Sequence, residues 1–596
     1  MMRSLYSFVL LALARIALSE GKTDCIAIEK GFKQELNAHK QPVCICADSG
    51  IFSTIDGFTI ECESASIASV SENLASLNGT VLGRLTIRDS TVNVLPQDLF
   101  DNVFAKQVKL ERCGLSTLLP KSFQSLGASL EFLSLRENRI RKLENGLFSG
   151  LKKIKTLDLA MNKIQEVDSG VFEELKHVED LLLNENEIRE LKAGIFDGLK
   201  SLKKLTLQSC GLEKIEKGAF RGLDSLEELI LSNNNLENID WSIFTSLKNL
   251  RILDLGSNRI SNVELKSFLK LEKLVLNNNT IDSMKAIKLK DLPALVVALF
   301  DRNKIQSIGD MDMFGLTKSD RIETMSLAWN NLSQISSKAF QHTPNLITLL
   351  LQNNQIEELT GSKYSAAQIR IPFLAILKKL ATLQLSANNL SIIRADELPK
   401  SLINLALDHN VITKIEARAL EGMAIKRLYL HNNKLTYLYR GTFDSFKPTT
   451  IEAIDVSLNS WQCVCADPKE WLPSWLSEAE ESDVSEGPIG CLAIPGCGQE
   501  DSGKNVDVKI FVRSGWVTVA ATILTVVTIG IMAVIAILYF KDYRHQFPLR
   551  GRRSNSDLHK LIENDPLNIP SDSILVVPAM PKRNNGPKKT VRFQNF

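Results

Sequence analysis

The chain has 596 residues, of which 44% are hydrophobic, and its 71 Lys and Arg against 69 Asp and Glu give a net charge of +2 at pH 7. This near balance gives no electrostatic basis for a nucleic-acid partner. The sequence also lacks a zinc-hydrolase H-E-x-x-H pair, a phosphate-binding glycine loop and a nucleophile elbow. We therefore expect no enzyme, no metal ion and no cofactor.

Residues 1–19 have the features of a secretory signal peptide. Arg3 precedes an apolar run, and Ala17-Leu18-Ser19 offers a cleavage site. The apolar stretch is too short for a membrane helix. Residues 20–80 then hold four cysteines, for which we expect disulfides of open connectivity. These are Cys25, Cys44, Cys46 and Cys62.

Residues 81–458 contain an eleven-residue pattern, L-x-x-L-x-L-x-x-N-x-L, that recurs about fifteen times at steps of about 24 residues. Most ninth positions are followed ten residues later by Phe. Each copy predicts one short strand, and stacked copies join their Leu and Phe columns into one core. We expect an α/β repeat fold, a curved solenoid with parallel strands on its concave face. The ninth position is occupied by Ser90, Cys113, Asn138, Asn162, Asn186, Cys210, Asn234, Asn258, Asn279, Asn303, Asn330, Asn354, Asn388, Asn410 and Asn433.

The Asn column at the ninth position is expected to be structural. An Asn amide both donates and accepts, so it can satisfy backbone groups within and between turns. Cys113 and Cys210 stand in this column four repeats apart, which is roughly 19 Å along a stack of strands and too far for a disulfide. We expect both to be buried free thiols.

The repeats and the segment after them resemble extracellular leucine-rich-repeat proteins. Residues 459–498 begin with the run from Asn459 through Trp461 and Cys463 to Cys465, and this stretch is similar to the C-terminal cysteine cap of that family. The resemblance implies disulfides between Cys463 and Cys491 and between Cys465 and Cys497. Ser460 stands where family members often have Pro.

Pattern positions three, five, seven and eight should face the concavity, where such residues are ordinarily polar. From the fifth repeat onward several of them are apolar, which is typical of a protein-binding surface. The alternative is that apolar and β-branched residues simply suit strands. We call this set the concave patch, and it consists of Leu182, Ile230, Ile252, Val275, Val297, Leu299, Trp329 and Leu350.

Two local features fall in the later repeats. The step from Asn354 to Asn388 is 34 residues, which predicts an outward excursion with a helical segment interrupted by Pro372, either a partner loop or a tolerated insertion. His409 and His431 fall on adjacent strands. Two imidazoles could bind a metal or sense pH, but we expect solvated surface histidines.

Residues 499–516 are predicted to be a juxtamembrane linker, and residues 517–540 are about two dozen residues without a charge, enough to span a bilayer. Lys541 and Arg544 follow, so the positive-inside rule places the C-terminus in the cytosol. We expect a single-pass type I protein of the plasma membrane with its N-terminus outside the cell. Its predicted N-glycosylation sites are Asn78, Asn278, Asn331 and Asn389.

Residues 541–596 carry eleven Lys and Arg against five Asp and Glu, and their composition predicts a disordered cytoplasmic tail. The end of this tail resembles the R-V-x-F docking motif of type 1 protein phosphatase regulators. The resemblance implies that Val591 and Phe593 fill pockets while Lys589 lies near acidic surface. Coincidence or a basic membrane anchor is the alternative.

These features predict a non-catalytic cell-surface receptor or adhesion protein that binds an extracellular or cell-surface protein ligand through the solenoid, with homophilic pairing left open. The alternative is a membrane scaffold that recruits cytosolic type 1 protein phosphatase through its tail.

Overall fold

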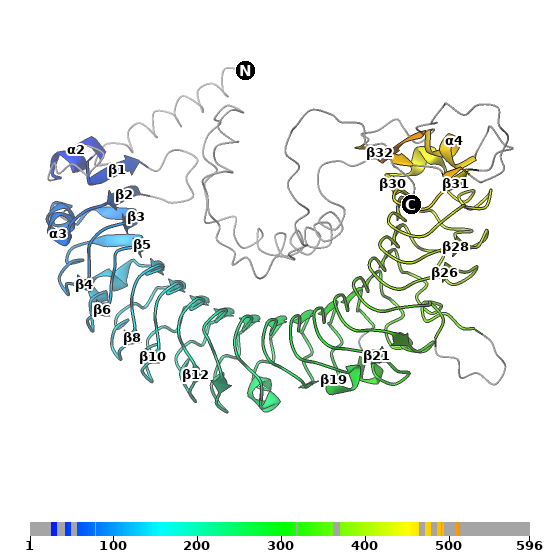
Figure 1. The fold of residues 1–596 in the computed structure, drawn as a ribbon. Coiled ribbons are helices and arrows are strands. Elements are labelled where there is room, and N and C mark those ends of the chain that lie inside the picture. Colours follow the sequence, from blue (N-terminus) through cyan, green and yellow to red (C-terminus); the bar gives the residue numbers. More distant parts are fainter. Residues whose placement is uncertain are drawn as a thin grey trace, which may run out of the picture.

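The structure is a computed structural model that describes residues 25–32, 42–48, 57–77, 79–316, 320–361, 370–463, 471–477, 485–489, 492–493 and 508–512. The predicted signal peptide, membrane segment and cytoplasmic tail lie outside these residues. The described part is a curved solenoid (Figure 1), which confirms the repeat architecture expected from the sequence. None of the helices in that part is long and apolar enough to cross a membrane.

One sheet of 18 strands lines the inner side of the arc (Figure 1). Sixteen of these strands come from successive repeats and pair in parallel, one more than the fifteen copies counted in the sequence. They are β3 (Val81–Arg88), β5 (Phe104–Glu111), β7 (Phe132–Ser134), β9 (Thr156–Asp158), β11 (Asp180–Leu182), β13 (Lys204–Thr206), β15 (Glu228–Ile230), β16 (Ile252–Asp254), β18 (Lys273–Val275), β20 (Val297–Leu299), β22 (Thr324–Ser326), β24 (Thr348–Leu350), β25 (Thr382–Gln384), β27 (Asn404–Ala406), β29 (Arg427–Tyr429) and β30 (Ala453–Asp455).

The N-terminal end of the sheet is closed by a disulfide-bonded unit. Strand β1 (Cys44–Asp48) runs antiparallel to β2 (Phe58–Glu63), which pairs in parallel with β3. Helices α2 (Cys25–Lys30) and α3 (Ile67–Ala75) lie in the same unit, and the Ser66 side chain caps α3 by accepting from the Ser69 amide. Disulfides join Cys25 to Cys46 and Cys44 to Cys62, which is the connectivity that the sequence left open.

The outer side of the solenoid is made of short paired strands and 3₁₀ turns (Figure 1). The strand pairs are β4 (Val94–Leu95) with β6 (Thr117–Leu118), β8 (Lys142–Leu143) with β10 (Glu166–Val167), β12 (Glu190–Leu191) with β14 (Lys214–Ile215), β17 (Val263–Lys266) with β19 (Ile287–Lys290), β21 (Ser307–Ile308) with β23 (Gln334–Ile335), and β26 (Ile392–Ile393) with β28 (Lys414–Ile415). The 3₁₀ turns are η1 (Gln124–Ala128), η2 (Trp241–Phe244), η3 (Met284–Ala286), η4 (Phe314–Leu316) and η5 (Pro448–Thr450).

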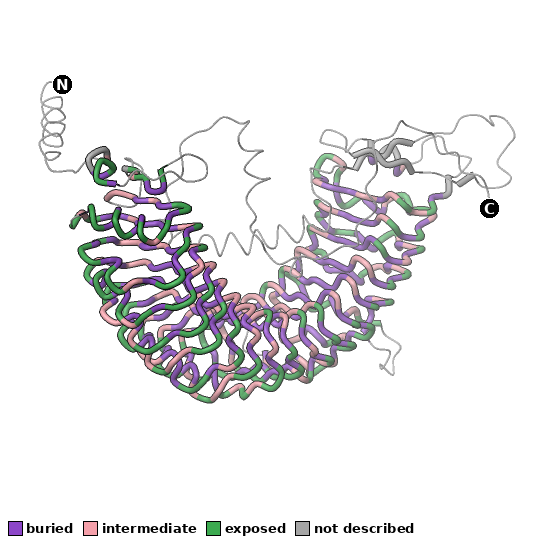
Figure 2. Tube along the Cα trace, turned by 60° about the vertical axis from the view of Figure 1, so that its left-hand side comes forward, coloured by how far each residue is buried: buried purple, intermediate pink, exposed green. Residues whose placement is uncertain are grey.

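A column of Phe side chains runs through the core. Consecutive rings from Phe100 to Phe244 stack with centroids 5.8–6.3 Å apart. Buried residues follow the inside of every turn (Figure 2), so each repeat relies on its neighbours to cover its core. The seven stacked residues are Phe100, Phe123, Phe148, Phe172, Phe196, Phe220 and Phe244.

The Asn column joins each repeat to the one before it. Asn258 donates through Nδ2 to the carbonyl oxygens of Leu231 and Leu255, at 3.0 and 3.1 Å, and accepts from the Leu236 amide at 3.0 Å. In all sixteen repeats the residue that precedes the column position has a left-handed backbone conformation, as at Ser257 with φ of 53°. The predicted structural role of this column is therefore confirmed.

Cys113 and Cys210 are buried and free, as expected. The Cys210 thiol donates to the Leu183 carbonyl at 3.1 Å. Burial raises the pKa of Cys113 to about 11 and that of Cys210 to about 12. Both thiols stay protonated and act as small structural donors.

The long step between Asn354 and Asn388 contains no helix in its described part, which excludes residues 362–369. Thr360 and Pro372 form an antiparallel bridge, and the buried Phe373 lies 6.1 Å from Phe340. Phe373 thus continues the aromatic packing after the excursion.

The chain beyond β30 packs against the end of the core through α4 (Trp471–Ser477), in which Leu472 and Leu476 are buried and Trp475 lies 5.0 Å from the Phe443 ring. Strands β31 (Gln462–Cys463) and β33 (Leu492–Ala493) pair in parallel, and β32 (Ser485–Ile489) and β34 (Val508–Val512) pair antiparallel. The predicted disulfides of Cys463, Cys465, Cys491 and Cys497 fall outside the described residues and side chains.

Candidate functional site

The concave patch lies on the central strands of the inner sheet, from β11 to β24. Seven of its eight side chains are half-buried, so they present part of their surface to the concavity. Leu350 is different, because it is buried, with only 4% of its surface exposed. A partner could contact the other seven without moving the backbone.

The strand register shows that the concave patch is not one continuous apolar surface. Val275 pairs directly with Leu299, and Val297 lies two residues before Leu299 on the same strand. We call these three residues the apolar centre. Polar residues interrupt the rest of pattern position five, which reads Leu182, Thr206, Ile230, Asp254, Val275, Leu299, Ser326 and Leu350 in register.

Trp329 lies one repeat beyond the apolar centre, in the turn after β22. The Arg302 guanidinium carbon is 5.0 Å from the centroid of its ring, a cation–π distance. Both residues have the left-handed conformation common to their pattern position, with φ of 54° at Arg302 and 56° at Trp329. The contact links the indole to a side chain of the preceding repeat.

Burial perturbs the charged groups beside the apolar centre. It raises the pKa of Asp301 to about 6, although Ser326 and the Ala328 amide donate to that carboxylate. Burial also raises the pKa of Asp254 and lowers the pKa of Lys273. These shifts mark a poorly solvated surface, where a polar contact with a partner is stronger than in water.

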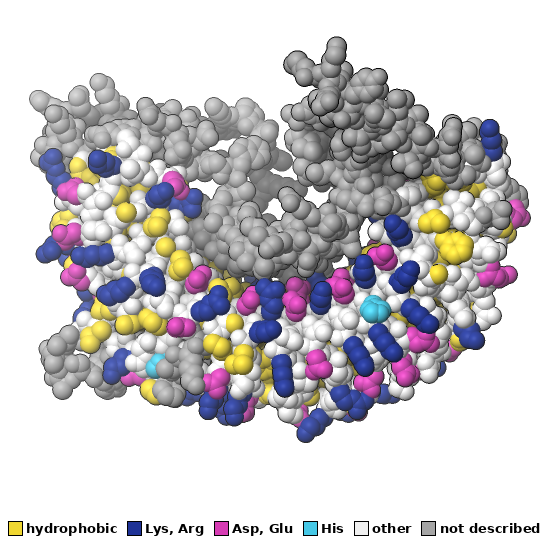
Figure 3. All heavy atoms as spheres, turned by 180° about the vertical axis from the view of Figure 1, so that it is seen from behind, with side chains coloured by type: hydrophobic (Ala, Val, Ile, Leu, Met, Phe, Trp, Pro, Cys, Tyr) yellow, Lys and Arg dark blue, Asp and Glu magenta, His cyan; other side chains and the backbone are white. Residues whose placement is uncertain are grey.

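Charges of both signs are interspersed along the arc (Figure 3). Some of them link successive repeats at pattern position two, where Lys155 lies 2.8 Å from Glu131 and Lys203 lies 2.7 Å from Glu179. Exposed pairs of this kind contribute about 0–1 kcal/mol each. The surface therefore favours a partner of mixed charge over a uniformly charged one.

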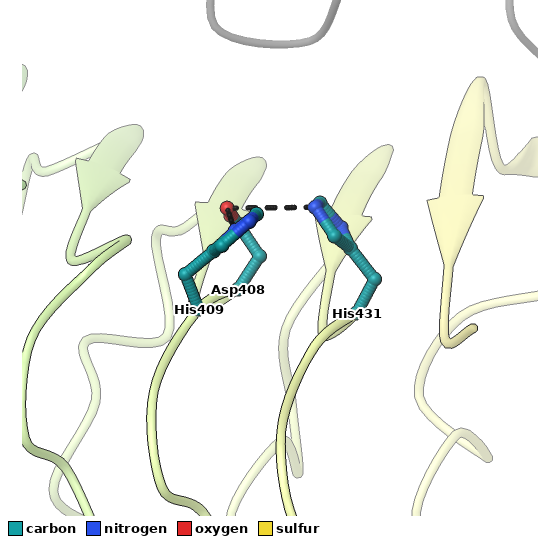
Figure 4. Close-up of side chains that lie close together, drawn as sticks. All are labelled: Asp408, His409 and His431. Carbon is teal, nitrogen blue, oxygen red and sulfur yellow. Dashed lines mark hydrogen bonds and ion pairs between the residues drawn. The ribbon is translucent and has the colours of Figure 1, made fainter. Parts of the chain in front are cut away.

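A second group of polar residues lies in the turns that follow β27 and β29 (Figure 4). Asp408 Oδ2 is 2.9 Å from His409 Nδ1 and 3.7 Å from His431 Nε2. The Asp455 carboxylate lies 3.3 Å from the other ring nitrogen of His431. We call these four residues the histidine cluster.

Both histidines were expected to be solvated, and neither aspartate was among the predicted site residues. His431 is mostly buried, with 14% of its side chain exposed, whereas His409 is half exposed at 49%. Asp408 and His431 occupy the same pattern position on consecutive repeats. Reading that column across repeats would have found the pair.

Only some of the remaining predicted site residues belong to the part of the chain that the structure describes. Asn278, Asn331 and Asn389 are exposed, and Asn78 lies outside the described residues. The tail residues Lys589, Val591 and Phe593 are also outside them, so the phosphatase motif stays a prediction.

The inner parallel sheet, the Asn column and the Phe column together define a leucine-rich-repeat protein. The family model described as Leucine rich repeat matches residues 105–164, 153–212, 200–260, 224–274 and 378–435. The chain belongs to the leucine-rich-repeat family.

Individual relatives match over different lengths. The chain is 82% identical to P-granule-associated novel protein 1 of Caenorhabditis elegans over 596 residues, which is 100% of both chains. It is 33% identical to fibromodulin of Sus scrofa over 145 residues, 24% of this chain and 88% of that relative. It is 31% identical to lumican of Gallus gallus over 140 residues, 23% of this chain and 38% of that relative.

Among solved structures, the chain is similar to one from the Toll–Spätzle complex of Drosophila, with a TM-score of 0.50 and 16% identity over 72% of this chain and 71% of that one. At this identity the likeness concerns the fold alone.

The predicted localisation at the plasma membrane, with the N-terminus outside the cell and the C-terminus in the cytosol, is wrong. The relative that is 82% identical over its full length is named for association with P granules. The error has a physical origin, because the length of an apolar segment indicates whether it could cross a bilayer and not where a protein resides.

Proposed function

We propose that this chain is a non-catalytic protein-binding solenoid whose partner docks on the concave sheet around the apolar centre and Trp329. The observation that carries the proposal is the direct pairing of Val275 with Leu299 one repeat before an indole held by Arg302. Aromatic and Arg anchors in a partly desolvated setting dominate the energy of many protein interfaces.

The chemistry of the site also indicates which groups the partner must present. Half-buried aliphatic side chains and Trp329 require an apolar protrusion, while Lys273 and Asp301 on either side require polar groups to match them. A protein segment with apolar anchors between charges of both signs meets these requirements. A solenoid of this fold is named in complex with a protein, Spätzle, which supports a protein partner here.

A receptor or adhesion role at a cell surface depended on the localisation that the relative contradicts. We therefore propose the binding role without that position, and homophilic pairing stays one form that it could take.

The test is affinity purification of the full-length chain from its native cells, followed by quantitative mass spectrometry. We compare the natural chain with the double substitution Leu299→Arg and Trp329→Arg. A matched control is Leu269→Arg, because Leu269 is 63% exposed and lies outside the inner sheet, between β17 and β18.

The proposal predicts that at least one protein is recovered with the natural chain and the Leu269 variant and lost with the double variant. Identical protein sets from all three chains, each with the same circular dichroism spectrum, would place the binding surface elsewhere.

A further inference from the structure

The histidine cluster lies apart from the apolar centre and has no part in the proposed docking. It joins three potential metal ligands, Asp408, His409 and His431, whose nearest donor atoms all lie within 4.8 Å of one another. The two imidazole rings are edge to face, with centroids 4.9 Å apart and an interplanar angle of 86°. Figure 4 shows both rings approaching the carboxylate of Asp408.

We propose that Asp408, His409 and His431 bind one zinc ion on the concave surface, with water completing the coordination. Two imidazole nitrogens and one carboxylate oxygen suit Zn²⁺, whereas Ca²⁺ and Mg²⁺ prefer oxygen ligands alone. Three protein ligands leave one tetrahedral position open to solvent.

The distances fit this coordination with a small adjustment. Zinc bonds of about 2.0–2.1 Å to nitrogen and oxygen place tetrahedral donors about 3.3 Å apart. The observed separations from Asp408 Oδ2 are 2.9 Å to His409 Nδ1 and 3.7 Å to His431 Nε2, one on each side of that value. His409 is half exposed and can turn to lengthen its contact.

Contacts around the ligands hold them in the orientation that a metal needs. The Ser386 hydroxyl donates to Asp408 Oδ1 at 2.6 Å, so Oδ2 is the oxygen that faces the histidines. Asp455 Oδ2 lies 3.3 Å from His431 Nδ1, and a proton shared there leaves Nε2 with its lone pair toward Asp408. Metal-binding histidines commonly have such a carboxylate behind them.

Asp455 is itself fixed in place. Its Oδ1 accepts from the Ser457 amide at 2.9 Å and from the Ser457 hydroxyl at 2.7 Å. His431 Nδ1 is buried and has no well-aligned hydrogen bond, despite the nearby carboxylate. A small rotation of the ring toward a metal would align it.

Simple ion pairing explains less of this arrangement. One Asp408 oxygen faces nitrogens of two imidazoles but forms a hydrogen bond with one of them, that of His409. A metal ion at the common point would satisfy all three groups at once.

The test uses the full-length chain without a polyhistidine tag, stripped of metal and titrated with ZnCl₂ by isothermal calorimetry. We expect a site of one Zn²⁺ per chain that is lost in His431→Ala and in His409→Gln. His177→Ala is the matched control, because His177 is exposed and lies on a distant repeat. Asp455→Asn should weaken binding about 10–100-fold, as loss of an orienting carboxylate does.

His409→Gln keeps the test decisive if His431→Ala fails to fold, because His409 is half exposed and its replacement leaves the core intact. Titration with Co²⁺ gives a second readout, since a tetrahedral site produces intense visible absorption that the variants should lack. Equal zinc affinity and stoichiometry in the natural chain and His409→Gln, including no detectable binding in either, would overturn the proposal.

Discussion

The guanidinium of Arg302 lies 5.0 Å from the ring centroid of Trp329, in the neighbouring repeat. Because this contact positions the indole before a partner arrives, less conformational freedom is lost when the partner binds. Trp329→Ala should therefore weaken binding of the concave-face partner by 30-fold or more, roughly the 2 kcal/mol typical of an interface hot spot. Arg302→Ala should weaken it less, by about 5-fold, roughly the 1 kcal/mol of an exposed cation–π contact. Calorimetry with the purified partner measures both, and equal loss from the two substitutions would contradict the ranking.

Each Phe of the column should stabilise mainly the repeats next to it. Phe220 is fully buried between two ring neighbours, so Phe220→Ala should cost about 3–5 kcal/mol. Phe104 is 37% exposed, and Phe104→Ala should cost less than about 1.5 kcal/mol. Urea unfolding compares the two, and hydrogen exchange should show the loss concentrated in the repeats around Phe220. Similar costs at both positions would argue against the stacked core.

The consecutive residues Asn234 and Asn235 allow a buried asparagine of the column to be compared with a half-exposed asparagine outside it. Asn234 donates to the carbonyls of Leu207 and Leu231 and accepts from the Leu212 amide, whereas the side chain of Asn235 is half exposed outside this column. Asn234→Ala leaves buried backbone groups without partners and should cost about 2–4 kcal/mol. Asn235→Ala should stay within about 0.5 kcal/mol. Thermal melts of the two variants measure the difference in stability. A loss of stability in Asn234→Ala no larger than that in Asn235→Ala would refute the structural role of the column.

The two free thiols should be chemically silent in the folded chain. Since the thiolate is the reactive form, pKa values of about 11 at Cys113 and about 12 at Cys210 leave almost none of it at pH 8. Iodoacetamide should label neither residue until urea unfolds the repeats, as read by peptide mass spectrometry. Rapid labelling of either thiol in the native chain would contradict their burial.

The ionisation of Asp301 makes part of the stability depend on pH. Burial raises its folded pKa to about 6, above the unfolded value of about 3.9, so the folded chain binds more protons between these values. Stability should therefore fall as pH rises from about 4 to about 7, by about 1–3 kcal/mol after allowance for partial exposure. Asp301→Asn keeps an oxygen for Ser326 and the Ala328 amide and should flatten that dependence. Melting temperatures measured across this pH range test the prediction. If the melting temperature of Asp301→Asn changes with pH as steeply as that of the natural chain, Asp301 is not the cause.

Much of the fold could be predicted because each repeat is a local unit. The Leu positions, the Asn column and the free thiols at Cys113 and Cys210 follow from periodicity and from the fixed spacing of strands. The sequence did not give the pairing of Cys25 with Cys46, because connectivity depends on how α2 and β1 meet in space. The excursion around Pro372 was also left without a defined conformation, because no periodic pattern constrains that segment.

The candidate site was less predictable than the fold. Pattern position five marked Leu299 and Leu350 alike, but Leu350 is buried, and one-dimensional spacing carries no information on how neighbouring side chains cover a residue. The histidine cluster needed the register between β27, β29 and β30, which places Asp408 and Asp455 on either side of His431.

Site-specific photocrosslinking in native cells shows whether a protein partner docks on the concave sheet. A benzophenone amino acid replaces Leu299 on the inner sheet or, in a matched chain, the exposed Leu269 outside it. If the partner docks there, position 299 gives a discrete protein adduct that is absent from position 269 and disappears when Trp329 is changed to Arg. Adducts from position 269 alone, or the same adducts from both positions, would contradict it.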